Sequence, residues 1–120
     1  MEIGFIKKLI NVIVSNESKS SATDEELVKT YLRTGDSAAF NEIISRYADR
    51  VYGFALRITQ NTSDAEEVFQ EVFLILTKKL DTFRGDSKFS SWLYRVTANS
   101  AYMFMRSQKK HENNLSLEDY

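Results

Sequence analysis

Apolar side chains recur with helical spacing in the first half of the chain, and polar residues interrupt the pattern where helices typically end. Thr23 or Asp24 is suited to cap a first helix, and Gly35 to end it. Asp36 or Ser37 begins a second, longer helix, which the polar turn at residues 60–64 ends. The predicted buried stripes of these two helices are Leu27, Val28, Tyr31 and Leu32, and then Phe40, Ile43, Ile44, Tyr47, Val51, Phe54, Ala55 and Ile58.

The same spacing predicts two further helices in the second half. Ser63 or Asp64 is expected to cap the third helix, a loop follows over residues 81–88, and the fourth helix is expected from near Ser90 to about Lys109. No strand-like alternation and no internal repeat occurs, so the prediction is an all-α, compact bundle of about four helices. The expected apolar faces are Ala65, Val68, Phe69, Val72, Phe73, Ile75, Leu76 and Leu80, and then Phe89, Trp92, Leu93, Val96 and Ser100.

Gly53 lies inside the second stripe, where it lowers helix stability and would allow close packing. The chain has no proline to interrupt its helices, and its 120 residues and 42% apolar content suit one folded domain. The first 14 residues lack the pattern of a targeting signal and are too few to span a bilayer. We expect residues 1–23 to form an amphipathic or flexible extension with a polar linker, and no membrane insertion.

Composition also limits the chemistry. The absence of cysteine excludes disulfides and thiolate metal sites and fits a reducing cytoplasm. The single histidine, His111, leaves no plausible zinc cluster or Ser-His-Asp triad. The sequence therefore predicts a non-enzymatic protein without metal or cofactor.

The net charge of −1 conceals a strong asymmetry. Residues 1–77 carry 8 basic and 12 acidic side chains, whereas residues 78–111 carry 8 basic and 2 acidic ones. Within residues 81–99, DTFRGDSKFSSWLYRVTAN, cations alternate with aromatic rings around Gly85. This mixture suits a partner that presents both phosphates and unstacked bases. The acidic helix before it, residues 64–80, suits a basic protein instead.

These segments resemble the region-2 domain of extracytoplasmic-function (ECF) sigma factors of bacterial RNA polymerase. Residues 80–99 resemble the promoter-recognition segment, DAEEVFQEVFLIL resembles the core-binding helix, and GDSAAFNEIISRYADRVYGFALRIT matches the first helices of the region. The resemblance covers about residues 24–111, in the family's order and spacing. It implies a helical domain that binds the polymerase core and the −10 promoter element, with an anti-sigma factor as a regulatory partner.

The resemblance also implies roles for individual residues. The acidic helix would dock on arginines of the clamp helices of the β′ subunit, through Asp64, Glu66, Glu67, Gln70 and Glu71. The following loop would capture a base flipped out of the non-template strand, with Phe83, Gly85 and Ser87 at the pocket wall and Arg84 and Lys88 on phosphates. The expected DNA contacts on the fourth helix are Tyr94, Arg95, Asn99, Arg106, Lys109 and Lys110.

Some residues have simpler explanations. A solvated helix face accounts for the glutamates, and an ordinary surface position accounts for Asn99. Phe89 and Trp92 fit a core better than a wedge between bases. Met103 stands where many members of the family place a polar DNA-reading residue.

A complete factor of this type has a second, −35-binding domain, for which 120 residues have no room. Residues 112–120 resemble the start of the interdomain linker, so we expect a cut domain or a truncated gene product. Two other hypotheses stay open: an interaction bundle that binds anti-sigma factor or clamp without DNA, and a small enzyme using carboxylates such as Glu67 and Glu71.

Overall fold

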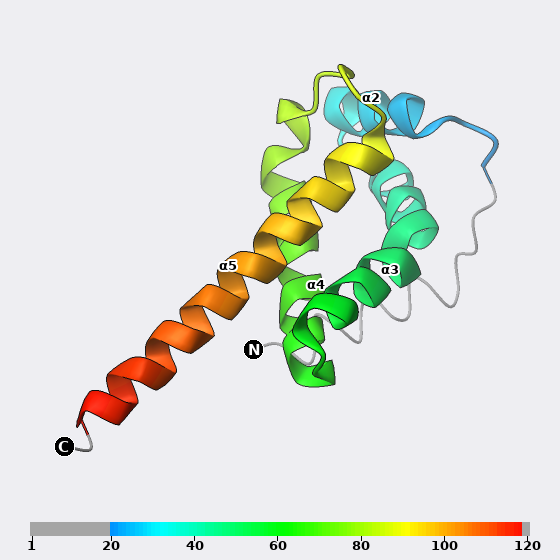
Figure 1. Cartoon of the computed structure of the whole chain (residues 1–120). Coiled ribbons are helices and arrows are strands. Elements are labelled where there is room, and N and C mark those ends of the chain that lie inside the picture. The colour runs from blue at the N-terminus through cyan, green and yellow to red at the C-terminus, as the bar shows by residue number, and fades with distance from the viewer. Residues whose placement is uncertain (1–19, 119–120) are drawn as a thin grey trace.

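A computed structural model describes residues 20–118, with side chains described up to His111. Four α-helices and one 3₁₀ turn make up this part of the chain, and it contains no strand (Figure 1). The all-α prediction is therefore confirmed. The elements are α2 (Asp24–Thr34), α3 (Ser37–Thr59), α4 (Thr62–Lys79), η1 (Leu80–Thr82) and α5 (Phe89–Glu118).

Local chemistry explains where α2 and α3 begin and end. Thr23 and Glu26 form a reciprocal capping box at the start of α2, and Gly35 ends the helix with a left-handed φ of 71°. The Asp36 side chain accepts from the Ala38 N–H and caps α3. The predicted starts of both helices are thus confirmed.

The start of α4 lies earlier than predicted. Asn61, in extended backbone, accepts from the Asp64 N–H through its side chain, so the helix begins at Thr62 rather than after Ser63 or Asp64. Gln60 ends α3 just before it in the left-handed region, with φ 55°. Asparagine, serine and aspartate are about equally good N-cap residues. The residue types of this turn therefore could not show which of them caps the helix.

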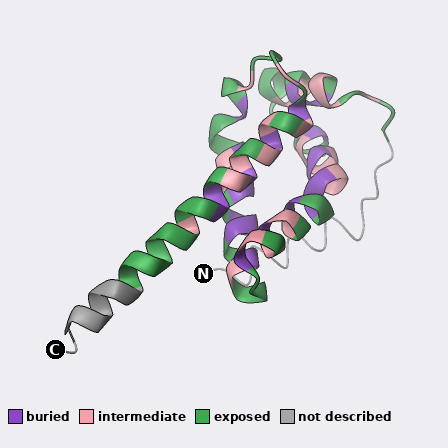
Figure 2. Ribbon diagram, viewed as in Figure 1, coloured by how far each residue is buried: buried purple, intermediate pink, exposed green. Residues whose placement is uncertain are grey.

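The core lies where α3 packs against α2, α4 and α5. Figure 2 shows the buried positions on the inward faces of these helices. Leu32, predicted to be buried, is 46% exposed. Within α2 only Leu27 and Val28 are buried. The largest fully buried apolar side chains come from the other three helices and η1: Phe73, Phe89, Ile43, Leu76, Leu80, Leu93, Val51, Val68 and Val72.

The last helix differs most from the prediction. It continues to Glu118 instead of ending near Lys109, because no proline or glycine interrupts residues 109–118. Figure 1 shows it running well beyond the other helices. Its buried positions end at Ala101, and Tyr102, Met103 and Met105 are exposed. The predicted loop is also shorter, since η1 takes up residues 80–82.

Candidate nucleic-acid and partner-protein interfaces

The segment between η1 and α5 holds the basic-aromatic residues in an exposed loop. Gly85 has a φ of 82°, a conformation that side chains other than glycine rarely adopt, and it reverses the chain between Arg84 and Lys88. Both cationic side chains are exposed and Ser87 is half-buried. The loop therefore presents two cations to solvent.

Three aromatic rings from the two ends of this loop pack against one another. The Phe83 ring lies 5.5 Å from Phe89 and 5.7 Å from Trp92, and these two lie 5.8 Å apart, measured between centroids. Phe89 is fully buried, whereas Phe83 and Trp92 are half-buried against the core. The prediction of a core role is confirmed for Phe89. The ring surface that remains accessible belongs to the other two.

The first turn of α5 is held by a residue far away in the sequence. The Lys88 carbonyl accepts from the Trp92 N–H at 3.1 Å, which places Lys88 at the N-cap, where its side chain offers no acceptor. Instead the Phe89 N–H donates to Oε2 of Glu25 on α2, at 3.3 Å. Figure 1 shows α2 next to the start of α5. Sequence reasoning missed Glu25, since nothing local links positions 64 residues apart.

Beyond this turn, α5 carries an exposed polar and basic face. Arg95, Asn99, Arg106, Lys109 and Lys110 are all exposed, and their spacing puts them on one side of the helix. Tyr94 differs from them, because it is half-buried against α3. Its ring makes edge contacts with Tyr47 at 6.4 Å and Phe54 at 6.0 Å. Only part of Tyr94 can thus meet a ligand.

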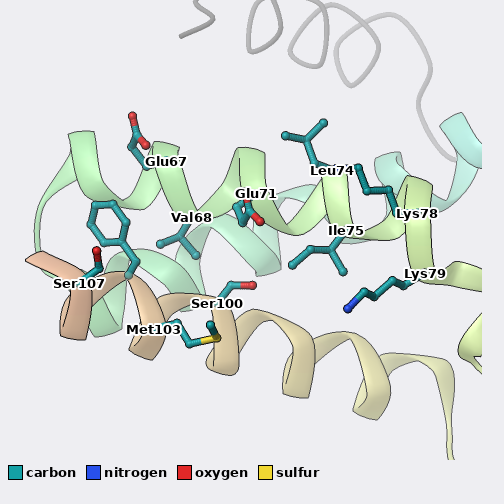
Figure 3. Close-up of a pocket in the computed structure, with 11 residues that line it drawn as sticks. Glu67, Val68, Glu71, Leu74, Ile75, Lys78, Lys79, Ser100, Met103 and Ser107 are labelled. Carbon is teal, nitrogen blue, oxygen red and sulfur yellow. The ribbon is translucent and has the colours of Figure 1, made fainter.

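A groove of about 690 Å³ runs between α4 and α5. Figure 3 shows Val68, Ile75 and Met103 pointing toward the space between the helices, with Glu71 at its α4 side, while the Glu67 carboxylate points away from α5 at the edge of the groove. Both glutamates are exposed, and Met103 is 65% exposed. The groove thus combines apolar surface with Glu67 and Glu71 along one part and Lys78 and Lys79 along another, so it suits an apolar partner whose basic side chains meet the glutamates.

The five predicted core-binding residues differ in their exposure and in their relation to the groove. Only Glu67 and Glu71 line the groove; Asp64 and Glu66 are half-buried, and Gln70 is only 9% exposed. A buried glutamine on α4 belongs to the packing of the free domain. The helical period predicted the acidic face, whereas the extent to which each side chain is buried depends on the neighbouring helices.

An ion-pair network joins α2 to α3. Arg46 donates to Asp24 and to Glu42, each at 3.0 Å, and to the Ser20 carbonyl at 2.9 Å. The Tyr47 hydroxyl also donates to Asp24, and burial, with this bond as a second cause, raises the pKa of Tyr47. The network fixes the start of α2, the segment that carries Glu25.

Residues 20–111, whose side chains the structure describes, contain no cluster of His, Cys, Asp and Glu that could hold a metal ion. Within residues 20–118, none of the helices combines the length and the hydropathy needed to cross a bilayer.

Comparison with known proteins identifies the fold. The family model for sigma-70 region 2 matches residues 43–111, which include the groove, the loop and most of α5. The chain belongs to the sigma-70 region 2 family. The resemblance seen in the sequence is thereby confirmed.

The relatives are bacterial sigma factors. The RNA polymerase sigma-H factor of Pseudomonas aeruginosa is 33% identical over 80% of this chain and 50% of its own length. The ECF RNA polymerase sigma-E factors of Haemophilus influenzae and Escherichia coli are 36% and 38% identical, over 77% and 72% of this chain and 48% and 44% of their own lengths. The chain thus spans about half the length of the relatives it matches.

A solved structure also resembles this one. It is an NMR structure of an engineered region 2 of sigmaE in complex with GTAAAA, with a TM-score of 0.68 and 33% sequence identity. The match covers 78% of this chain and 96% of the other.

Proposed function

We propose that this domain acts in transcription initiation, binding the non-template single strand of the −10 promoter element and the core RNA polymerase at the same time. The observation that carries this proposal is the exposed pair Arg84 and Lys88 in a loop whose two ends bring together the Phe83 and Trp92 rings, in a family from which an engineered region 2 of sigmaE was solved with GTAAAA. No chemistry on a substrate is involved. The proposed place of action is the cytoplasm.

On the DNA side, the loop would receive one unstacked base. Extruding a base costs about a few kcal/mol, and stacking on an aromatic ring contributes about 1–3 kcal/mol per base. Phe83 and Trp92 can supply the stacking surface, because part of each ring remains accessible. Arg84 and Lys88 would bind the adjoining phosphates, and Arg95 and Asn99 would meet the strand along α5.

On the protein side, the α4–α5 groove would receive the β′ clamp helices. The carboxylates of Glu67 and Glu71 suit arginine forks, while Met103 and Ile75 offer apolar contact. An anti-sigma factor that covered this groove would compete with the polymerase. The proposed docking surface therefore rests on two of the five acidic-helix positions, with Gln70 supporting them from within the fold.

Two titrations of the ¹⁵N-labelled domain test the proposal. Addition of the DNA hexamer GTAAAA is expected to shift the amide signals of residues 84–88, and the shuffled hexamer AAGATA to bind more weakly. A recombinant clamp-helix fragment is expected to bind the wild type and to bind Glu71→Ala less tightly. Asp49→Ala serves as the matched control, since Asp49 is also an exposed carboxylate within a helix.

The outcomes separate the competing hypotheses. Clamp binding without any DNA-dependent shift would indicate an interaction bundle and contradict the DNA half of the proposal. Failure of the folded domain to bind either ligand would contradict the whole proposal. An equal loss of clamp affinity in both carboxylate variants would indicate general charge attraction instead of contacts in the groove.

A further inference from the structure

A second hollow, of about 400 Å³, lies between α3 and the beginning of α5. Its lining residues are Arg50, Gly53, Phe54 and Arg57 of α3 and Tyr94 of α5, none of which lines the α4–α5 groove. Arg50 and Arg57 are exposed and lie two helical turns apart on the same face. The sequence does carry a signal for this site, namely two arginines seven residues apart with a glycine between them.

Gly53 is the least expected residue of this hollow. It lies within a continuous helix, and a Cβ added to it would meet nothing within 4 Å. A glycine inside a helix lowers stability by about 0.5–1 kcal/mol relative to alanine. Neither a turn nor close helix packing requires it here, so the close-packing role expected from the sequence is wrong. Its effect is to leave the backbone of α3 open at the hollow.

The side chains around this opening suit a nucleotide. Phe54 and Tyr94 meet edge to face with centroids 6.0 Å apart, and both are half-buried, so each keeps part of its ring accessible. Arg50 lies over the Tyr47 ring, 5.5 Å from its centroid, and a hydrogen bond with Tyr94 raises the pKa of Arg50. This guanidinium therefore already contacts an aromatic ring before any ligand arrives.

Arg57 lies at the other end of the same face. Within the described part of the chain it has no hydrogen-bond or ion-pair partner. A cation left unpaired beside two aromatic rings suits a phosphate. The volume is also within the range of small-ligand sites and is too small for a helix of a partner protein.

We propose that this hollow binds one nucleotide of single-stranded DNA, with its phosphate between Arg50 and Arg57 and its base against Phe54 and Tyr94 over the open backbone of Gly53. The inference rests on the proposed function, because the nucleotide belongs to the same strand that the loop receives. Tyr94 lies in the second turn of α5, directly after the loop, and joins the two sites. The hollow thus extends the DNA path from the loop onto α3.

Gly53→Ala gives the sharpest test, because it is expected to weaken binding without destabilising the fold. The added methyl group meets no protein atom, so the melting temperature is expected to rise or stay unchanged. Affinity for a 12-nucleotide strand, GTAAAA with three thymidines on each side, is expected to fall roughly threefold, and further with the larger Gly53→Gln. Arg57→Ala is expected to lower the affinity roughly fivefold at low salt.

Arg33→Ala is the matched control, since it removes one exposed arginine from α2, outside the hollow. Its effect on affinity is expected to be less than twofold. In ¹⁵N spectra, the amide signals of residues 53–57 are expected to shift with this strand together with those of residues 84–88.

Two results would overturn the proposal while leaving the function of the loop intact. In one, the strand shifts the amide signals of residues 84–88 but not those of residues 53–57, and Gly53→Ala binds the strand as tightly as the wild type. The other is an equal effect of Arg57→Ala and Arg33→Ala, which would indicate long-range charge alone. If neither segment responds to the strand, both the hollow and the proposed function are wrong.

Discussion

The carboxylate of Asp24 joins two helices by accepting from two different side chains of α3. Arg46 reaches Oδ1 at 3.0 Å, and the hydroxyl of Tyr47 donates to Oδ2. Tyr47 is buried, and Arg46 and Asp24 are largely shielded from solvent. Since a buried polar group is costly without a partner, each member of this network depends on the others.

Tyr47→Phe tests the importance of this network. The substitution keeps the ring and its contacts with Phe89 and Tyr94 but removes the donor to Asp24. We expect the free energy of unfolding to fall by about 1.5–3 kcal/mol, because the hydrogen bond goes to a charged acceptor. Urea denaturation would measure the change. Tyr102→Phe is the control, because Tyr102 is 58% exposed; an equal effect of the two changes would show that the Asp24 bond contributes nothing.

Single residues also show what a sequence can and cannot predict. The periodic pattern correctly predicted buried positions such as Phe73 and Leu93, because the side of a helix follows from spacing alone. It failed for Leu32, which is exposed, and it gave no sign that Gln70 is buried. Both depend on how neighbouring helices are placed. The roles of Arg50 and Glu25 likewise arise from residues distant in the chain.

At the scale of elements, α2 holds the first turn of α5 in place. Its acidic first turn contributes Asp24 to the network with α3 and Glu25 to the first N–H of α5. A carboxylate at this position also interacts favourably with the positive end of the α5 helix dipole. Because the loop ends at Lys88, any loosening of the first turn of α5 moves the loop's attachment point.

Glu25→Ala is expected to lower the free energy of unfolding by about 1 kcal/mol, the usual contribution of a helix cap. Adding Lys88→Asp should restore part of this loss, since aspartate at the N-cap accepts from the next turn of α5 itself. Thermal denaturation of the two single variants and the double variant would measure the coupling. Strictly additive effects would mean that Glu25 does not cap α5.

The order and number of the helices followed from the sequence, but several helix ends did not. Capping by Thr23, Gly35 and Asp36 was predictable, because these residues act within one turn. The continuation of α5 to Glu118 was not, since residues 112–118 lack an apolar period. No proline or glycine in that part stops the helix, and a search for buried stripes cannot detect such a continuation.

At the scale of the whole molecule, two proposed interfaces share α5. The loop at its first turn presents only exposed cations, whereas the groove further along, at Ser100, Met103, Phe104 and Ser107, meets both glutamates and lysines of α4. The net charge of −1 therefore says little about partners. Attraction to a polyanion depends on how the cations of residues 78–111 are placed, and its salt dependence reports how many of them meet phosphates.

The double variant Arg84→Ala/Lys88→Ala measures this local contribution. Each phosphate contact on single-stranded DNA adds about 0.7 to the slope of log K against log salt concentration, so the slope is expected to decrease by about 1.4. Fluorescence anisotropy with a labelled GTAAAA strand at several salt concentrations would give the slope. Lys29→Ala/Arg33→Ala removes two exposed cations from α2 instead and leaves the same net charge. If both double variants lower the slope equally, the strand responds to the overall field of the protein, and the loop does not bind phosphates directly.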